Sequence, residues 1–282
     1  MAIKAIEIFE QGIQANHQSS LRQGNVVNLP NRGSLVVTGD LHGHTRNFER
    51  IVTCADLDAY PDRHVVLQEI IHGGPRDEEG GCLSYRSLLD AINYKLRYPE
   101  QVHIIMGNHD TAFICDAEVM KDSRAMNKAL YLALGREFGE SWTRVRDVMR
   151  EYLFSQPLAV RTANRIWMSH SLPADRLVDQ FDTTVLHREL NLADLVKPGG
   201  AYVLTWGRRM SQAVLNRMAE RFEVDLFVLG HQPQPQGWRQ AGENLLILAC
   251  DHNHGHICTL DLDKNYTMDT LLQCVLPLSA IA

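Results

Sequence analysis

Six short apolar runs recur along this chain, and segments with helical spacing of apolar residues separate several of them. Runs of this length and composition are typical of strands that are covered on both faces. They occupy 34–39, 64–69, 102–107, 165–170, 226–231 and 245–250. Their alternation with helical segments predicts an α/β protein built from βαβ units.

The helical segments and the composition of the chain predict how it is organised into helices and domains. We expect a short amphipathic helix over 1–20 and a helical insertion over about 111–156, in which 118–154 forms two helices separated near Gly135 to Gly139. No internal repeat, low-complexity tract or linker rich in proline and serine interrupts the chain. With 282 residues and 45% apolar content, we expect a single domain over 1–282 with one substantial core.

Charge and cysteine content limit the expected partners. The 28 basic and 34 acidic side chains give a net charge of -6 without a Lys/Arg block, so nucleic acid and anionic membranes are not expected partners. The first twenty residues lack the pattern of a signal peptide, and no apolar run reaches the roughly 18 residues of a membrane span. The six scattered cysteines contain no CxxC pair, which favours reduced thiols in a cytoplasmic protein.

Five of the six predicted strands end in side chains that bind metals. Because the carboxyl ends of strands line one crevice in open α/β sheets, groups far apart in sequence meet there. One such ending alone is better explained as an ordinary strand end, but five in the same position favour a shared site. The residues are Asp40, His42, Glu69, Asn108, His109, Asp110, His170 and His231.

The ligand types narrow the chemistry of this site. Carboxylates, imidazoles and one amide, without a thiolate, suit Mn²⁺, Fe or Zn²⁺ better than a structural zinc ion. Six ligands exceed the need of one ion that keeps open positions. Two ions that share a carboxylate fit better, and such pairs, about 4 Å apart, serve in-line displacement at phosphorus.

The motifs around these residues resemble those of the calcineurin-like metallophosphoesterases. GDLHG at 39–43 resembles GDxHG, GNHD at 107–110 resembles GNH[DE], and Ser169-His170 and Gly230-His231 resemble the two later histidine motifs, in the same order. GHQP at 230–233 lacks the second histidine of the GHxH form, and WGR at 206–208 resembles Trp-x-Arg. The most similar branch therefore comprises the phosphoprotein phosphatases and the bacterial dinucleoside tetraphosphatases. The resemblance implies a four-layer αββα sandwich.

The resemblance also implies a role for each matching residue. Six residues would bind two metal ions: Asp40, His42, Glu69, Asn108, His170 and His231. Glu69 would bridge the ions, which lower the pKa of a bridging water so that hydroxide forms near neutral pH. His109 would act as general acid, because an imidazole donates a proton near pH 7, and Arg208 would hold the phosphate oxygens.

The second motif departs from the family pattern. Where the family has GDxxDRG, this chain has QEIIHGG at 68–74, so that the bridging aspartate becomes Glu69. The aspartate that supports the general acid becomes His72, and the phosphate-binding arginine becomes Gly73.

Three interpretations of this departure remain open. In the first, Asp110 or Asp77 orients His109, and Arg76 replaces the missing arginine. In the second, His72 adds a contact to a metal or to the phosphate. In the third, catalysis is lost and a non-catalytic metal-binding interaction module remains. Because the other ligand positions and His109 are kept, we favour an active enzyme.

We therefore expect a dinuclear-metal-dependent phosphoesterase that acts on a phosphoprotein or a small phosphomonoester. A dinucleoside polyphosphate hydrolase is the alternative among enzymes. His252, His254 and His256 alternate, so on a strand they would share one face, which we expect to be exposed and outside the metal set.

Overall fold

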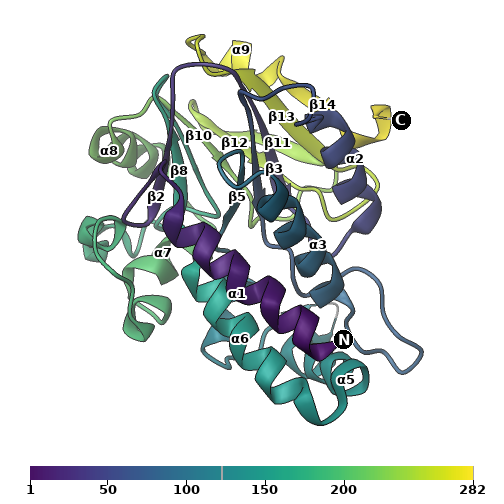
Figure 1. The fold of residues 1–282 in the computed structure, drawn as a ribbon. Coiled ribbons are helices and arrows are strands. Elements are labelled where there is room, and N and C mark those ends of the chain that lie inside the picture. Colours follow the sequence, from purple (N-terminus) through teal and green to yellow (C-terminus); the bar gives the residue numbers. More distant parts are fainter. Residues whose placement is uncertain (122, 282) are drawn as a thin grey trace.

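The computed structural model describes residues 1–121 and 123–281, and it contains two large sheets with helices outside them (Figure 1). In spatial order, the larger sheet consists of β1 (Arg22–Gln23), β2 (Val26–Leu29), β8 (Ala159–Thr162), β9 (Ile166–Ser169), β10 (Leu226–Leu229), β12 (Leu245–Leu248) and β11 (Trp238–Ala241). The smaller consists of β14 (Val275–Pro277), β13 (His256–Asp261), β3 (Ser34–Asp40), β4 (Arg63–Gln68) and β5 (Val102–Ile105).

Apolar side chains fill the space between the two sheets. Val37 and Val66 of the smaller sheet and Met168 and Val228 of the larger belong to this central core, and all four are fully buried. Both sheets alternate side chains between their faces, so each strand also presents apolar groups to an outer helical layer.

Helices cover both outer faces, which completes four layers. The smaller sheet packs against α1 (Ala2–Gln18), α2 (Thr45–Ala55), α3 (Ser84–Arg97), α5 (Met126–Phe138) and α6 (Trp142–Ser155). The larger packs against α7 (Gly200–Trp206) and α8 (Gln212–Phe222), whereas α9 (Met268–Leu272) joins the central core. Short 3₁₀ helices occupy Gly139–Ser141, Val178–Gln180, Thr183–Leu186, Leu192–Leu195 and Leu278–Ala280. The predicted αββα sandwich is confirmed.

The six apolar runs correspond to β3, β4, β5, β9, β10 and β12, and the helix expected near the N-terminus corresponds to α1. Within 111–156, the chain forms the end of α4 (Asn108–Ile114), a hairpin of β6 (Met120–Lys121) and β7 (Arg124–Ala125), and then α5 and α6. The expectation of a helix from Glu118 onward was wrong at its start, because the hairpin precedes α5. Helix α5 also continues through Gly135 and ends at Phe138.

The three late histidines do not share a strand, although none of them is buried. Strand β13 begins at His256, while His252 and His254 lie in the preceding turn. The turn is needed because the chain crosses here from β12 in the larger sheet to β13, which pairs antiparallel with β3 in the smaller.

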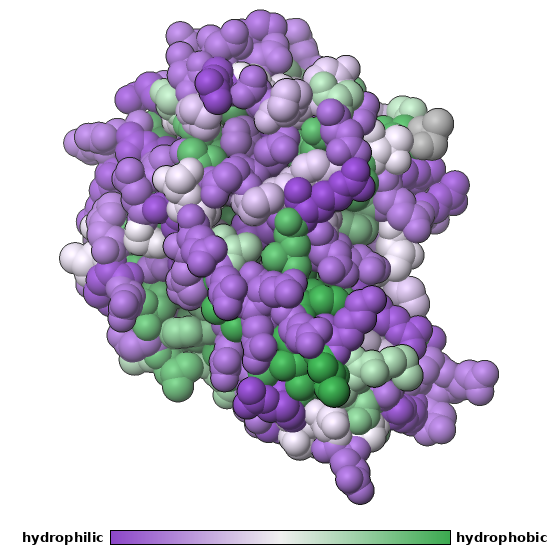
Figure 2. Space-filling model, in the orientation of Figure 1, coloured by the Kyte–Doolittle hydropathy of each residue, from purple (hydrophilic) through white to green (hydrophobic). Residues whose placement is uncertain are grey.

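The surface agrees with this packing. Figure 2 shows a mainly hydrophilic face on which apolar side chains form smaller groups.

Within the described residues, no helix combines the length and apolar character that crossing a membrane requires. All six cysteines are free thiols.

Candidate metal centre

The carboxyl ends of five strands from both sheets meet at one place. β3, β4 and β5 are parallel neighbours in the smaller sheet, and β9 and β10 are parallel neighbours in the larger. The sheets join at Asp40, whose carbonyl oxygen accepts a hydrogen bond of 2.9 Å from the Cys250 backbone N–H. This junction brings the six predicted metal ligands together.

Asp40 connects the two halves of the site. A register shift in β3 between Val37 and Asp40 interrupts the regular pairing before the carboxylate. Asp40 Oδ1 then accepts a hydrogen bond of 2.7 Å from the backbone N–H of His231, at the end of β10. A Cβ atom at Gly230 would lie 2.3 Å from this oxygen, so the glycine of the GH pair makes room for the carboxylate.

Glu69 lies just after β4 and is fully buried. Its Oε1 accepts a hydrogen bond of 3.0 Å from the His109 backbone N–H, at the start of α4. A Cβ atom at Gly107 would lie 2.3 Å from Glu69 Oε2, so the first glycine of GNHD makes room for this carboxylate as well. Glu69 is thereby held between the smaller sheet and α4.

Three further predicted ligands surround the same point. Asn108 Oδ1 lies 2.9 Å from His170 Nε2 and 2.8 Å from His231 Nδ1. His170 Nε2 also lies 2.7 Å from Glu69 Oε2. The separation is short, but the two atoms do not have hydrogen-bond geometry, since Glu69 Oε2 is a buried atom without a hydrogen-bond partner.

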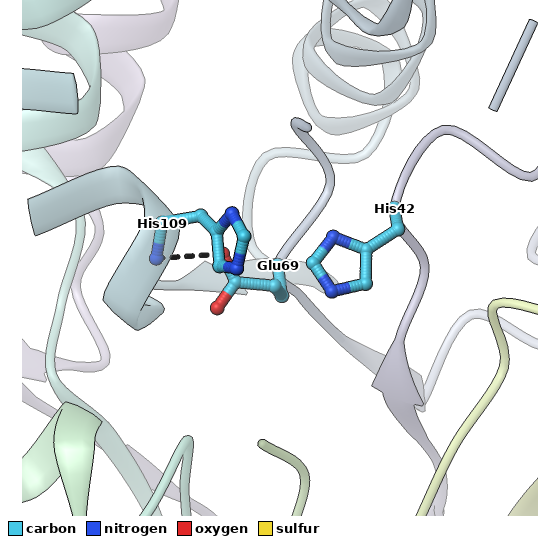
Figure 3. Close-up of side chains that lie close together, drawn as sticks. All are labelled: His42, Glu69 and His109. Carbon is cyan, nitrogen blue, oxygen red and sulfur yellow. Dashed lines mark hydrogen bonds between the residues drawn. The ribbon is translucent and has the colours of Figure 1, made fainter. Parts of the chain in front are cut away.

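His42, Glu69 and His109 form a second compact group of metal-binding atoms. One ligand atom from each lies within 4.8 Å of the others (Figure 3). In the view of Figure 3, the His109 ring overlaps the Glu69 carboxylate, and the His42 ring lies to the right of the Glu69 side chain. His109 was expected to act as general acid rather than as a ligand, and the structure places its ring next to this carboxylate.

Two histidines are held with one ring nitrogen free for a metal ion. His42 Nδ1 donates to the Ile71 carbonyl oxygen at 2.9 Å, and His170 Nδ1 donates to Gln68 Oε1 at 2.8 Å. Gln68 Nε2 donates to the Thr38 carbonyl oxygen, so that Gln68 Oε1 is the acceptor. Both neutral rings therefore carry their proton on Nδ1 and leave Nε2 unprotonated, which is the form that binds metals. With this tautomer, His170 Nε2 and Asn108 Oδ1 are two acceptors that face each other at 2.9 Å without a proton between them.

Buried polar atoms without partners fit a cation at this site. Among the described residues, Glu69 Oε2, His72 Nε2 and His231 Nε2 have no hydrogen-bond partner. Leaving a buried acceptor unpaired costs about 1–3 kcal/mol. A metal ion would provide the missing partner for Glu69 Oε2, which is why this donor set fits the predicted metals.

Burial also shifts the pKa values of these groups in the absence of a cation. It raises the pKa of Asp40 to about 6 and that of Glu69 to about 8, and it lowers the pKa of His42 to about 3 and that of His170 to about 4. Imidazoles that stay neutral are ready to bind a metal, while the carboxylates must lose their protons first. Metal binding is therefore coupled to proton release.

The site contains an unusual backbone that the sequence did not reveal. His42, Glu69, His72 and His231 all have positive φ angles, from 43° to 66°. This region is unfavourable for residues other than glycine, at roughly 1–3 kcal/mol each. Four of the nine non-glycine residues with positive φ in the described part of the chain are therefore candidate site residues.

The substituted second motif gives His109 a histidine partner. His72 Nδ1 lies 3.0 Å from His109 Nδ1, so one neutral ring donates to the other. The expected orienting role of Asp77 was wrong, because its carboxylate pairs with Arg136 at 2.7 Å. Asp110 accepts a hydrogen bond of 2.8 Å from the Gly107 backbone N–H, which braces the start of α4.

The two predicted phosphate-binding arginines lie at the surface. Arg208 follows α7 and is exposed, and its charge is among the causes that lower the pKa of His170 and His231 after burial. Arg76 is exposed in the loop that pairs with Cys82 through a single β-bridge. Of these two arginines, Arg208 is therefore the one whose positive charge acts on the predicted metal ligands.

Gln68 is the residue that sequence reasoning missed. It occupies the position of the first glycine in the family motif, is fully buried, and fixes the protonation of His170. A polar residue inside the apolar run HVVLQE was the available signal, because a buried amide requires hydrogen-bond partners.

The comparisons with known proteins agree with this fold. Residues 33–235 match the model of a family described as calcineurin-like phosphoesterase. The chain belongs to this family, and it is a metal-dependent hydrolase of phosphoester bonds.

Individual relatives are distant but cover most of the chain. The serine/threonine-protein phosphatase 4 catalytic subunit of Saccharomyces cerevisiae is 22% identical over 280 residues, covering 90% of this chain and 82% of that protein. The Kluyveromyces lactis subunit is 22% identical over 264 residues, covering 85% and 79%.

Solved structures with the same fold include phosphatases from two sources. A Saccharomyces cerevisiae protein serine/threonine phosphatase with similarity to human phosphatase PP5 superposes with a TM-score of 0.70 at 13% identity, covering 99% of this chain and 93% of that one. A cold-active protein-tyrosine phosphatase of a psychrophile Shewanella gives 0.58 at 15% identity, covering 84% and 77%.

Proposed function

We propose that this protein hydrolyses a phosphomonoester, in a phosphoprotein or a small molecule, with two metal ions bound at the strand ends. The convergence of ligands from both sheets on Glu69 carries the proposal. They are Asp40, His42, Asn108, His170 and His231. Mn²⁺, Fe or Zn²⁺ suit this donor set.

The ligands divide into two groups around Glu69. Asp40 and His42 would hold one ion, and Asn108, His170 and His231 the other, with Glu69 shared between them. When bound, the ions would neutralise the phosphate charge and acidify water for the attack on phosphorus. The chain itself supplies the bare Nε2 atoms of His42 and His170 and excludes solvent from Glu69.

His109 is proposed as the general acid. In its acid form the His109 ring is an imidazolium, whose Nδ1–H would donate to His72 Nδ1 while its Nε2–H is available to a leaving oxygen; loss of the Nε2 proton then leaves a neutral ring. A histidine partner brings no negative charge, so it orients His109 without favouring the charged imidazolium as an aspartate would. Arg208 would hold the phosphate oxygens, because its guanidinium matches their geometry.

Hydrolysis of 4-nitrophenyl phosphate tests this proposal. The protein is stripped with a chelator, and activity is measured before and after Mn²⁺ is restored. We expect metal-dependent turnover that Asp40→Asn abolishes, that His109→Ala lowers, and that the remote charge variant Arg32→Gln keeps. Bound metal without turnover, for Mn²⁺, Fe and Zn²⁺ in turn, would instead identify a non-catalytic binding module.

A second comparison identifies the substrate class. Specificity constants are measured for a phosphoserine peptide and for a dinucleoside tetraphosphate under the same conditions. We expect the phosphomonoester to be the better substrate. A large preference for the dinucleotide would replace our first choice with the polyphosphate hydrolase. We include in the proposal a cytoplasmic setting, in which the six thiols stay reduced.

A further inference from the structure

A cavity lies beside the metal centre, between the end of α7 and the segment that follows β9. Its volume is about 430 Å³. The lining residues are Ala174, Asp175, Arg176, Leu177, Tyr202, Trp206, Arg208 and Arg209. Three arginines in so small a lining give the cavity a positive character, although the whole chain carries a net charge of -6.

The three guanidinium groups of this cavity have no protein partner. Among residues 1–121 and 123–281, Arg176, Arg208 and Arg209 form neither an ion pair nor a side-chain hydrogen bond, unlike many arginines of this chain. The one carboxylate in the lining, Asp175, is already used, since it accepts from the backbone N–H of Ser211 at 3.1 Å and from the Ser211 hydroxyl. The donors of the arginines are therefore available to a ligand.

The cavity adjoins the metal centre through Trp206. The Trp206 indole N–H donates to Thr111 Oγ1 at 3.0 Å, and Thr111 lies in the same helix as His109. The Trp206 ring lies 6.5 Å from the His231 ring, measured between centroids. A ligand that spans the metal centre and this cavity therefore passes Trp206 and Arg208.

The aromatic wall of the cavity is rigid. Tyr202 and Trp206 lie one helical turn apart on α7 and stack with an interplanar angle of 14° and a centroid distance of 5.6 Å. Helix α7 is anchored by buried Val203 and Leu204. Groups held on a packed helix bind a ligand with little loss of conformational freedom.

We propose that this arginine pocket, formed by Arg176, Tyr202, Trp206, Arg208 and Arg209, binds a second anionic group of the substrate. The group is a carboxylate or a phosphate separate from the phosphate that is hydrolysed. Guanidinium groups bind both bidentately, and Arg176 and Arg209 are the arginines left for this purpose when Arg208 faces the scissile phosphate. The inference rests on the proposed function, and it names substrates that carry a negative charge beside the phosphoester.

Matched substrates test the pocket. One set contains phosphoserine peptides with glutamate or glutamine at each neighbouring position in turn. The other contains propane-1,3-diol bisphosphate and its monophosphate. The readout is the ratio of kcat/KM for the more acidic over the less acidic member, which cancels effects common to both. The set with the larger ratio identifies whether the second anion is a carboxylate of a protein or a phosphate of a small molecule.

We expect one of these ratios to be about tenfold or more in the unaltered protein, as one or two charge-assisted hydrogen bonds supply. This ratio should fall toward one in the double variant Arg176→Gln/Arg209→Gln. It should stay the same in the control Arg32→Gln, because the Arg32 side chain is exposed at the opposite, amino end of β3. Ratios near one in the unaltered protein, or a ratio that the double variant leaves intact, overturn the inference.

Binding separates this inference from the proposed function. The dissociation constants of the same peptides, with a non-hydrolysable phosphonate in place of the phosphate, are measured by calorimetry. A glutamate preference that the double variant loses supports the pocket even if 4-nitrophenyl phosphate is not hydrolysed, in which case only the proposed function fails. Turnover without any preference, in rate or in binding, overturns the pocket alone.

Discussion

Two pairs of buried histidines lie along the same two strands, one at each end. His64 Nδ1 lies 3.2 Å from His103 Nε2, and these residues belong to β4 and β5. Beyond the carboxyl ends of the same strands, His72 Nδ1 lies 3.0 Å from His109 Nδ1. Burial lowers the pKa of all four imidazoles. By burial and pKa alone, the two pairs look alike.

Their surroundings differ. His109 has Glu69 beside it, and His72 Nε2 is a buried atom without a partner. The first pair faces Lys95, whose ammonium donates to the Val102 carbonyl oxygen at 2.9 Å. Burial of histidine therefore does not identify a site. A buried carboxylate, atoms without partners and a left-handed backbone do.

The largest expected effect is that of Glu69→Ala. Because Glu69 is the proposed shared ligand, the change should release both metal ions and lower kcat/KM for 4-nitrophenyl phosphate by about 10³-fold or more. That exceeds the roughly 10–100-fold loss for residues that only support ligands. Metal content by mass spectrometry checks the first effect. His64→Gln, in the other pair, should keep both metal and activity. Two tightly bound ions in Glu69→Ala would show that Glu69 is not the bridge.

His109→Ala and His103→Ala compare the pairs directly. Loss of a general acid should lower kcat by about 10²–10⁴-fold with metal still bound. His103→Ala removes a buried ring, so it should lower the free energy of unfolding by about 1–3 kcal/mol while kcat stays unchanged. Steady-state kinetics and urea unfolding of the metal-loaded protein measure both. Equal loss of kcat in the two variants would contradict the distinction.

A smaller effect is expected from Gln68→Leu. Leucine is similar in size, but His170 Nδ1 loses its acceptor, so metal affinity should fall about 10–100-fold. Competition with a chelator measures the affinity. Gln101→Leu is the matched control, because Gln101 donates to the Arg63 carbonyl oxygen at the amino end of β4. The same affinity in both variants would mean that Gln68 does not orient the ligand.

The smallest effect concerns pH. Burial lowers the pKa of His64 and His103 below the ordinary value of 6.5, so below this pH the unfolded chain binds more protons than the native one. Stability is then lost as the pH falls, by at most about 1.4 kcal/mol per pH unit for each histidine. In the chelated protein, His64→Gln/His103→Gln should have a flatter dependence of unfolding free energy on pH below about 6.5. An unchanged slope would show that the pair is not responsible.

Several features of the fold were predictable because they depend on local pattern. The six apolar runs became six strands because aliphatic side chains on both faces suit a sheet covered on both sides. β2, β8, β11, β13 and β14 were not predicted. β2, β11, β13 and β14 lie at or next to a sheet edge, where pairing with distant segments decides the conformation more than composition does.

The ligand residues were visible in the sequence, but their partners were not. Asp40, Asn108 and His231 each end a recognisable strand or motif. The contacts that prepare them involve separations of 102 residues for Gln68 with His170 and 191 for Asp40 with His231. Asp77 seemed suitable for His109 because of its position in the chain, yet Arg136 from α5 pairs with it instead.

The sequence by itself determined the class of fold, the family and the identity of the candidate ligands, because these depend on periodicity and on short motifs in order. Only the tertiary structure decided that the His72 ring contacts the His109 ring, that Gln68 sets the protonation of His170, and that three unpaired arginines line a cavity next to the metal centre. Each of these depends on which side chains from different layers meet, and that is settled only when the two sheets and their helices pack together.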